Sequence, residues 1–178
     1  MTTEFRIEAL NPTHDRKRFQ CGAEPLDRYL RELAKQDVER RVSNCFVALD
    51  DARSVAGYYT FAAAGLPLTE LPPAIAKKLP RYGVVPAGLI GRLAVDVKFR
   101  RRGLAGAMVM DAVLRAARAD PAIFALVADA KDENAEAFYR SLGFFAFAIR
   151  RSSFFLPIAT ALQALEKAER AGPHFKKT

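Results

Sequence analysis

The sequence has no tryptophan, and its 178 residues include only two cysteines and two histidines. Cys21 and Cys45 are too few for a disulfide framework and match no metal-binding spacing, so we interpret both as structural thiols. His14 and His174 lie near the two ends of the chain and are poor candidates for catalytic groups. We therefore expect no metal site.

Long apolar runs are also missing. No apolar stretch is long enough to span a bilayer, and the first ten residues lack the apolar core of a signal peptide. These features lead us to expect a cytoplasmic protein without a membrane segment.

Acidic residues are fewer than basic ones. The chain has 28 Lys and Arg against 20 Asp and Glu, which gives a net charge of +8 at pH 7. Such a surplus suggests a polyanionic partner, with nucleic acid as the first candidate. A basic protein that needs only solubility is the alternative. With 51% hydrophobic residues and no repeat, low-complexity tract or linker, residues 1–178 are expected to form a single globular domain.

The stretch Gly88–Arg118 has three parts in a fixed order. Leu89–Val95 is a short apolar run typical of a buried strand. Lys98–Gly106 is a basic turn with two glycines, and Leu104–Arg118 has the composition of a helix. A glycine turn that opens a helix directs several unpaired N–H groups and the positive end of the helix dipole to one point, which suits a phosphate or pyrophosphate.

The turn itself has the form Arg/Gln-x-x-Gly-x-Gly/Ala, in the residues Arg100, Arg101, Arg102, Gly103, Leu104 and Ala105. It is not a Walker loop, because no Gly-Lys-Ser/Thr follows. It is not the dinucleotide fingerprint, because only two glycines are present and their spacing is wrong. It resembles the pyrophosphate loop of GNAT acetyltransferases, which bind acetyl-CoA.

A second motif follows in the expected order. Ile123–Ala128 predicts a buried strand, and Asp132–Gly143 predicts a helix with acidic residues in its first turn and a glycine at its end. The pattern Asn-x-x-Ala-x-x-Phe-Tyr-x-x-x-Gly-Phe, which begins at Asn134, resembles the second cofactor motif of the same family. For Phe138 the interpretation as a core residue is preferred. For Tyr139 the resemblance favours a catalytic role over that of a half-buried structural tyrosine.

The first half of the chain predicts a strand over Glu4–Leu10 and an amphipathic helix over Leu26–Arg41. The apolar face of this helix carries Leu26, Tyr29, Leu30 and Leu33. The opposite face carries Arg28, Arg31 and Lys35, with Glu32 and Asp37 expected off this stripe. A charged face is usually just solvated, but a stripe of one sign suggests contact with a phosphate backbone.

The remaining segments are a pair of strands, a long loop and a C-terminal unit. Strands are predicted over Asn44–Leu49 and Ser54–Ala64, and a loop over Gly65–Gly88, since that stretch holds five prolines. The loop, with Lys77, Lys78 and Arg81, is either a wall of the substrate site or a surface excursion. Two closing strands over Phe145–Arg150 and Ser153–Leu156 and a helix over Thr160–Arg170 complete the chain.

Taken over most of its length, the chain resembles the GNAT toxins of bacterial type II toxin–antitoxin modules. Besides the two cofactor motifs, the matching residues are Phe19, Cys21, Gly22, Leu26, Asp27, Tyr29, Leu30, Gly57–Thr60, Leu79–Tyr82, Pro86 and Gly91–Asp96. Family members often have glycine where this chain has Arg101 and Ala105. That difference makes the loop stiffer and bears on cofactor affinity rather than cofactor identity.

The resemblance implies a fold and a reaction. The fold is mixed α/β: a mostly antiparallel twisted sheet, with one parallel pair splayed at the acetyl-CoA site and helices on both faces. The reaction is acetyl transfer from acetyl-CoA to the α-amino group of an aminoacyl-tRNA, which blocks translation. A small antitoxin, commonly of the ribbon-helix-helix type, restrains such toxins, and homodimers are common among them.

The resemblance also implies roles for particular residues. Tyr139 would protonate the thiolate that leaves, and a backbone N–H near Val95 would stabilise the developing oxyanion. The cofactor residues are Leu93, Ala94, Val95, Arg100, Arg101, Arg102, Gly103, Leu104, Ala105, Gly106, Asn134 and Phe138. The residues expected to contact RNA are Arg28, Arg31, Lys35, Lys77, Lys78 and Arg81.

No Glu or Asp near the first cofactor strand is a clear general base. Asp96 is the nearest candidate, and a structural turn residue is its more natural role. An α-amine has a pKa of about 8 and needs a base less than a lysine with a pKa of about 10.4, so the gap favours an α-amine acceptor. The alternatives are a GNAT enzyme acting on protein N-termini or small amines, and a nucleic-acid-binding module without catalysis.

Overall fold

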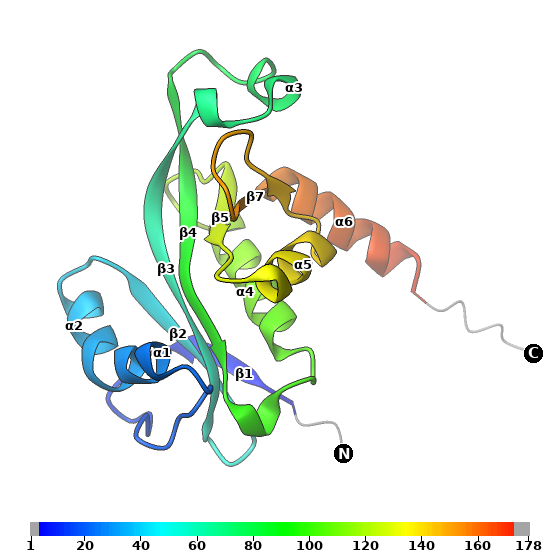
Figure 1. Cartoon of the computed structure of the whole chain (residues 1–178). Helices are drawn as coiled ribbons and strands as arrows, with labels where there is room; N and C mark the ends of the chain where they lie inside the picture. Colours follow the sequence, from blue (N-terminus) through cyan, green and yellow to red (C-terminus); the bar gives the residue numbers. More distant parts are fainter. Residues whose placement is uncertain (1–3, 173–178) are drawn as a thin grey trace, which may run out of the picture.

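The computed structural model describes residues 4–172, so His174 and the rest of the C-terminal end lie outside the described residues. A seven-stranded sheet with the order β1-β2-β3-β4-β5-β7-β6 forms the centre of the molecule (Figure 1). Its strands are β1 (Arg6–Ala9), β2 (Asn44–Leu49), β3 (Val55–Pro67), β4 (Val84–Val95), β5 (Ala125–Asp129), β6 (Phe145–Ala146) and β7 (Ser153–Pro157).

One pair of neighbouring strands in this sheet is parallel. β4 and β5 run in the same direction, and every other adjacent pair is antiparallel. The predicted mixed α/β sheet with a single parallel pair is therefore confirmed. The parallel pair needs a crossover, which the helix α4 (Leu104–Ala117) supplies.

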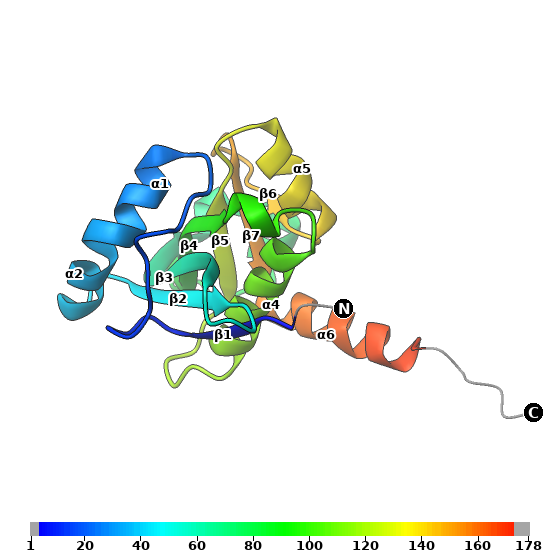
Figure 2. The same cartoon turned by 90° about the horizontal axis from the view of Figure 1, so that it is seen from below.

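Helices cover both faces of the sheet, as Figure 2 shows from below. α4, α5 (Glu133–Ser141) and α6 (Ile158–Arg170) pack on one face. α1 (Glu24–Arg28) and α2 (Ala34–Glu39) pack on the other. β2 is buried on both sides, because Phe46 and Ala48 face α4 while Val47 and Leu49 face α1 and α2. Burial on both faces explains why this strand is a continuous apolar run in the sequence.

The predicted loop Gly65–Gly88 is too long at both ends. β3 continues to Pro67 and β4 begins at Val84, so the loop shrinks to residues 68–83, which carry the short helix α3 (Pro73–Ala76). The prolines suggested a loop, yet Pro86 lies within β4 opposite Gly65. A proline is tolerated there because the parallel ladder to β5 starts only at Ala87, so no strand partner is denied a hydrogen bond.

The predicted helix Leu26–Arg41 differs from the observed one in three ways. It begins at Glu24, because a proline such as Pro25 is favourable in a first turn. A π-helical turn over Tyr29–Leu33 separates α1 from α2, and α2 ends at Glu39. The π turn shifts the helical period, which leaves Leu33 42% exposed although the pattern placed it on the buried face.

The C-terminal elements lie close to their predicted positions, except for one strand. Only Phe145–Ala146 of the predicted strand Phe145–Arg150 is extended. The segment after it turns towards the 68–83 loop, where the Ala148 N–H donates to the Glu70 carbonyl and the Arg150 guanidinium pairs with the Glu70 carboxylate at 2.5 Å. Contacts with a distant loop therefore replace strand pairing.

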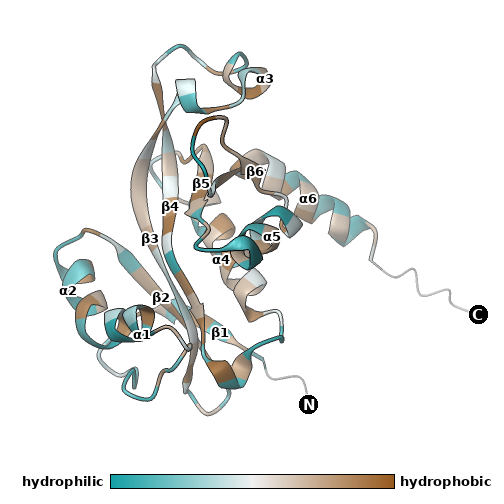
Figure 3. Ribbon diagram, viewed as in Figure 1, coloured by the Kyte–Doolittle hydropathy of each residue, from teal (hydrophilic) through white to brown (hydrophobic). Residues whose placement is uncertain are grey.

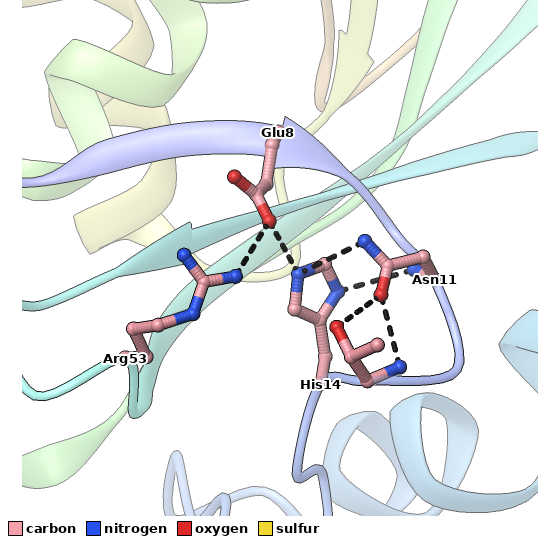
Figure 4. Close-up of polar contacts among 5 residues, drawn as sticks. Glu8, Asn11, His14 and Arg53 are labelled. Atoms are coloured by element: carbon pink, nitrogen blue, oxygen red, sulfur yellow. Dashed lines mark hydrogen bonds and ion pairs between the residues drawn. The ribbon is translucent and has the colours of Figure 1, made fainter.

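His14 belongs to a polar cluster that fastens the N-terminal segment (Figure 4). Its Nε2 lies 2.7 Å from Oε1 of Glu8 in β1, and its Nδ1 accepts the N–H of Asn11 at 3.1 Å. Arg53 reaches the same Glu8 oxygen at 3.2 Å. The ring is buried, with 6% of its surface exposed, so its role is structural.

Candidate active site

The central cavity lies where β4 separates from β5. The two strands pair only from Ala87–Ala125 to Ile90–Ala128, whereas β4 continues to Val95. Beyond Ile90, β4 is paired with β3 alone among the described strands. A cavity of about 480 Å³ opens at this free strand edge. It lies between the end of β4, the start of α4 and the first turns of α5.

A β-bulge shapes the open part of β4. Tyr59 pairs with Leu93 and Phe61 with Ile90, so Gly91 and Arg92 together oppose Thr60. The Arg92 N–H donates to the Thr60 hydroxyl at 2.9 Å. Bulges bend a strand and redirect its side chains, and they often lie beside active sites. This bulge was not predicted from the sequence, although a glycine within a strand is a signal for one.

Asp96 organises the turn that follows β4. Its carboxylate accepts the Lys98 N–H at 3.0 Å and the Gln20 N–H at 2.9 Å. The side chain is 4% exposed. These bonds confirm that Asp96 is a structural turn residue and argue against its being a general base.

The basic turn takes the left-handed backbone conformation twice before α4 begins. Arg101 has φ of 61° and Gly103 has φ of 75°. Gly103 is the N-cap of α4, and no side chain caps the helix there. The first N–H groups of α4 are thus available to an anion, and the helix dipole adds partial positive charge at the same place.

Two of the three arginines of this turn, Arg100 and Arg102, differ in what their side chains contact. Arg100 donates from its guanidinium to the carbonyl of Cys21, which ties the turn to the N-terminal segment. Gly22 has φ of 88°, a left-handed conformation that favours glycine, and a Cβ there would lie 2.9 Å from the same guanidinium nitrogen. The guanidinium of Arg102 lies over the Phe99 ring, 5.4 Å from its centroid.

Tyr139 lies in α5, with its ring buried and its hydroxyl at the cavity. Its ring packs against Phe138 and Phe144, each at a centroid distance of 5.2 Å. Within residues 4–172 the hydroxyl makes no hydrogen bond. Burial raises the pKa of Tyr139 to about 12, and the negative charge of Asp129 adds to the effect. The phenol is therefore protonated at neutral pH and is available as a donor.

The cavity brings together the predicted residues from both motifs: Leu93, Ala94, Val95, Ala105, Asn134, Phe138 and Tyr139. Phe138 serves both interpretations, because it lines the cavity and also packs against the core on the α4 face. Leu104 is 2% exposed and packs in the core, which leaves only its backbone for a ligand. The cavity lining does not include Arg100–Gly103 or Gly106, whose predicted contact with the cofactor stays a prediction.

Several residues of the cavity wall were not predicted from the sequence: Leu26, Arg92, Asp129, Lys131 and Asp132. The two carboxylates among them have structural partners. Asp132 caps α5 by accepting the Ala135 N–H at 2.8 Å, and Asp129 accepts the Ser153 hydroxyl at 2.5 Å. The position of Asp129 at the carboxyl end of a parallel strand was the available signal for it.

The face of the first helix that carries Arg28, Arg31 and Lys35 does not have charge of one sign only. Each of its three cations has a carboxylate partner: Arg28 pairs with Glu32 at 2.9 Å, Arg31 with Glu24 at 2.9 Å and Lys35 with Glu39 at 3.5 Å. Two of these pairs join residues one helical turn apart, a spacing at which side chains meet. The expectation that Glu32 lies away from the stripe is therefore wrong.

The six predicted RNA contacts form two separate groups. Lys77, Lys78 and Arg81 lie in the 68–83 loop, at the opposite end of the long β3–β4 hairpin from α1 and α2 (Figure 1). In the described part of the chain these three make no ion pair.

Figure 3 shows hydrophilic residues along the outer sides of α2 and α5.

Metal-binding clusters and membrane-spanning helices are both missing from the residues that the structure describes. Among residues 4–172, no group of three or more His, Cys, Asp or Glu side chains is placed to hold a metal ion. No helix in this range is long and apolar enough to cross a membrane.

The chain is similar to known proteins. A profile of the acetyltransferase (GNAT) family matches residues 8–144. A tRNA-acetylating toxin of Mycobacterium tuberculosis is 35% identical over 123 residues, which are 68% of this chain and 72% of that protein. The structure of AtaT complexed with acetyl-methionyl-tRNAfMet is 28% identical, with a TM-score of 0.82 over 91% of this chain and 99% of the other. A crystal structure of AtaTR bound with acetyl-CoA is 25% identical, with a TM-score of 0.75 over 90% and 98%.

Proposed function

This chain belongs to the acetyltransferase (GNAT) family, and we propose that it is a toxin that acetylates the α-amino group of an aminoacyl-tRNA and so blocks translation. The observation that carries the proposal is the Tyr139 hydroxyl, which has no hydrogen-bond partner between residues 4 and 172 and lines the cavity beside the open edge of β4. The tRNA-acetylating relatives support this choice of acceptor.

The cavity fits acetyl-CoA, the acetyl donor and therefore a substrate. The free edge of β4 offers backbone N–H and C=O groups from Leu93 to Val95, which suit the amides of an extended pantetheine arm. The uncapped start of α4 suits the pyrophosphate. Asn134 lines the wall at which the same arm would pass.

In the proposed acetyl transfer, each group has a distinct role. The thioester of acetyl-CoA supplies the acetyl group, and the attacking amine comes from the aminoacyl end. A backbone N–H near Val95 stabilises the negative charge that develops on the carbonyl oxygen. Tyr139 donates its proton towards the sulfur that leaves. No carboxylate base is required, because an α-amine with a pKa of about 8 is partly neutral at pH 7.

The proposed partners follow from this reaction. A tRNA substrate places the enzyme in the cytoplasm. A toxin of this kind needs a neutralising antitoxin, for which we propose a ribbon-helix-helix protein, and we propose that the toxin itself is a homodimer. An adjacent gene for a small ribbon-helix-helix protein would support the first of these partners.

The test is acetyl transfer from labelled acetyl-CoA to a pool of charged tRNAs. Wild type should label the aminoacyl group, and Tyr139→Phe should lower the rate by about 10²- to 10⁴-fold, the usual contribution of a general acid. Tyr59→Phe is the matched control, since Tyr59 is also buried but its hydroxyl bonds Asp111 outside the cavity. The affinity for acetyl-CoA should be the same in all three proteins.

Two results would change the proposal. Equal rates for wild type and Tyr139→Phe would keep the reaction and remove Tyr139 as the acid. Tight binding of acetyl-CoA without labelling of any charged tRNA would leave the fold in place and direct the search to protein N-termini and small amines as acceptors.

A further inference from the structure

Arg92 is a cavity residue that the mechanism above does not use. It lies on the β4 bulge, and its backbone N–H is held by the Thr60 hydroxyl. Its side chain lines the same cavity as Tyr139 and is half-buried. The bulge thus directs a cation into the catalytic cavity at a fixed point of the sheet.

The guanidinium of Arg92 is stacked on an aromatic ring. It lies 3.6 Å from the centroid of the Tyr29 ring. Tyr29 is itself fixed, because it is 3% exposed and its hydroxyl donates to Asp37 at 2.8 Å. Stacking restrains the flat guanidinium but uses none of its N–H groups, which all point outward in the plane of the group.

Within residues 4–172, no hydrogen bond or ion pair is made by the Arg92 guanidinium. The two carboxylates of the cavity, Asp129 and Asp132, have the structural partners described above and do not pair with it. Arg115 is an instructive contrast. It also stacks on a ring, 3.9 Å from the centroid of Phe46, but it is neutralised by Asp111 at 2.7 Å.

An oriented guanidinium whose N–H groups have no acceptor among the described residues fits an anion that accepts two parallel hydrogen bonds. Phosphate is such a group. The pyrophosphate of acetyl-CoA is expected at the start of α4. On the acceptor side, the α-amine itself has no attraction for a cation. The nearest anion in an aminoacyl-tRNA is the phosphate that joins its terminal nucleotide to the rest of the acceptor end.

We propose that Arg92, held flat on Tyr29, binds this terminal phosphate and thereby positions the α-amino group towards the thioester. This inference rests on the proposed function, and it makes Arg92 a positioning residue. Its effect should appear in the binding of tRNA and leave the affinity for acetyl-CoA unchanged.

The test is a double-mutant cycle between protein and RNA. The probes are an uncharged tRNA with a complete CCA end and the same tRNA without its terminal adenosine and the attached phosphate. Wild type should bind the complete tRNA about tenfold more tightly than the shortened one, within the range for a charge-assisted hydrogen bond. Arg92→Gln should weaken binding of the complete tRNA by about the same factor and leave binding of the shortened tRNA unchanged.

Two further variants sharpen the cycle. Arg92→Lys keeps the charge but loses the bidentate geometry, so it should recover only part of the loss. Arg170→Gln removes the same charge from an exposed position in α6 and should behave as wild type with both tRNAs. With charged tRNA, Arg92→Gln should raise KM by about tenfold while kcat changes less, as expected for lost substrate binding.

The inference is overturned if Arg92→Gln weakens binding of both tRNAs by the same factor, or if it weakens acetyl-CoA binding. If wild type acetylates charged tRNA and the cycle is additive, only the role of Arg92 fails. If wild type acetylates no charged tRNA, the proposed function fails and takes this inference with it.

Discussion

Tyr139 shows how the surroundings of one side chain set its chemistry. The phenol is enclosed by Phe138, Phe144 and Phe154, and its pKa is raised to about 12. Burial disfavours the phenolate, and the nearby carboxylate of Asp129 disfavours it further. The same aromatic cage that holds the ring in place therefore keeps the hydroxyl protonated.

This pKa predicts the pH dependence of the reaction. A group whose pKa is raised keeps its proton to higher pH, so the acid form of Tyr139 should persist well above pH 10. The kcat/KM for aminoacyl-tRNA should rise as the substrate ammonium loses its proton, level off near pH 8, and show no descending limb up to pH 10. Initial rates between pH 6 and 10, corrected for spontaneous deacylation, measure this. A fall near pH 9 would contradict the assignment of Tyr139 as the acid.

The turn before α4 carries strain at the scale of a single element. Arg101 and Gly103 both have positive φ, which is costly for a residue with a side chain. A Cβ at Gly103 would meet no atom within 4 Å, so any cost of adding one comes from the backbone conformation rather than from a clash. The arginine at 101 therefore makes the loop stiffer, but it does so in a conformation that glycine would adopt freely.

We expect unequal effects from two substitutions in this turn. Gly103→Ala should lower the free energy of unfolding by about 1–2 kcal/mol, the cost of the left-handed conformation for a residue with a Cβ. Arg101→Gly should change it by less than about 1 kcal/mol, because the relief of that strain offsets the greater chain entropy of glycine. Urea denaturation of the two variants measures both values. Equal destabilisation would show that the backbone conformation is not the cause.

At the scale of the whole molecule, the two basic groups differ in their local charge. Arg28, Arg31 and Lys35 are each paired with a carboxylate, whereas no ion pair joins Lys77, Lys78 or Arg81 to another residue of the 4–172 range. Exposed ion pairs are weak, so the paired cations are not excluded from RNA contact. Their net field is nevertheless smaller than that of the unpaired group.

We therefore predict that the 68–83 loop contributes more to tRNA affinity than the first helix. Replacing Lys77, Lys78 and Arg81 together with Gln should weaken tRNA binding and reduce the slope of log K against log salt by about 0.7–0.9 for each phosphate that the protein no longer neutralises. The matched triple replacement of Arg28, Arg31 and Lys35 should have a smaller effect on both. Binding titrations at several salt concentrations decide, and a larger effect from the helix triple would refute the prediction.

The resemblance of the motifs indicated the family, and local sequence patterns were enough to predict the order of the strand, glycine turn and helix and the position of Tyr139 on the second motif helix. These features depend on the conformational preferences of neighbouring residues, such as the glycine that ends a helix or the acidic residue that begins one. Asp96 could likewise be assigned to a turn, because its bond to the Lys98 N–H lies within the turn, whereas its bond to the Gln20 N–H, 76 residues away, was not predictable.

The features that join distant residues became visible only in the folded chain. The separation of β4 from β5, the stacking of Arg92 on Tyr29, and the bond from Arg100 to Cys21, 79 residues away, have no local signature. The prolines of residues 65–88 led to a predicted loop that is too long for the same reason. A proline interrupts a strand only where a neighbouring strand needs the N–H that proline lacks. Local patterns record what each backbone segment prefers, whereas the partner of a side chain is fixed only when the segments pack.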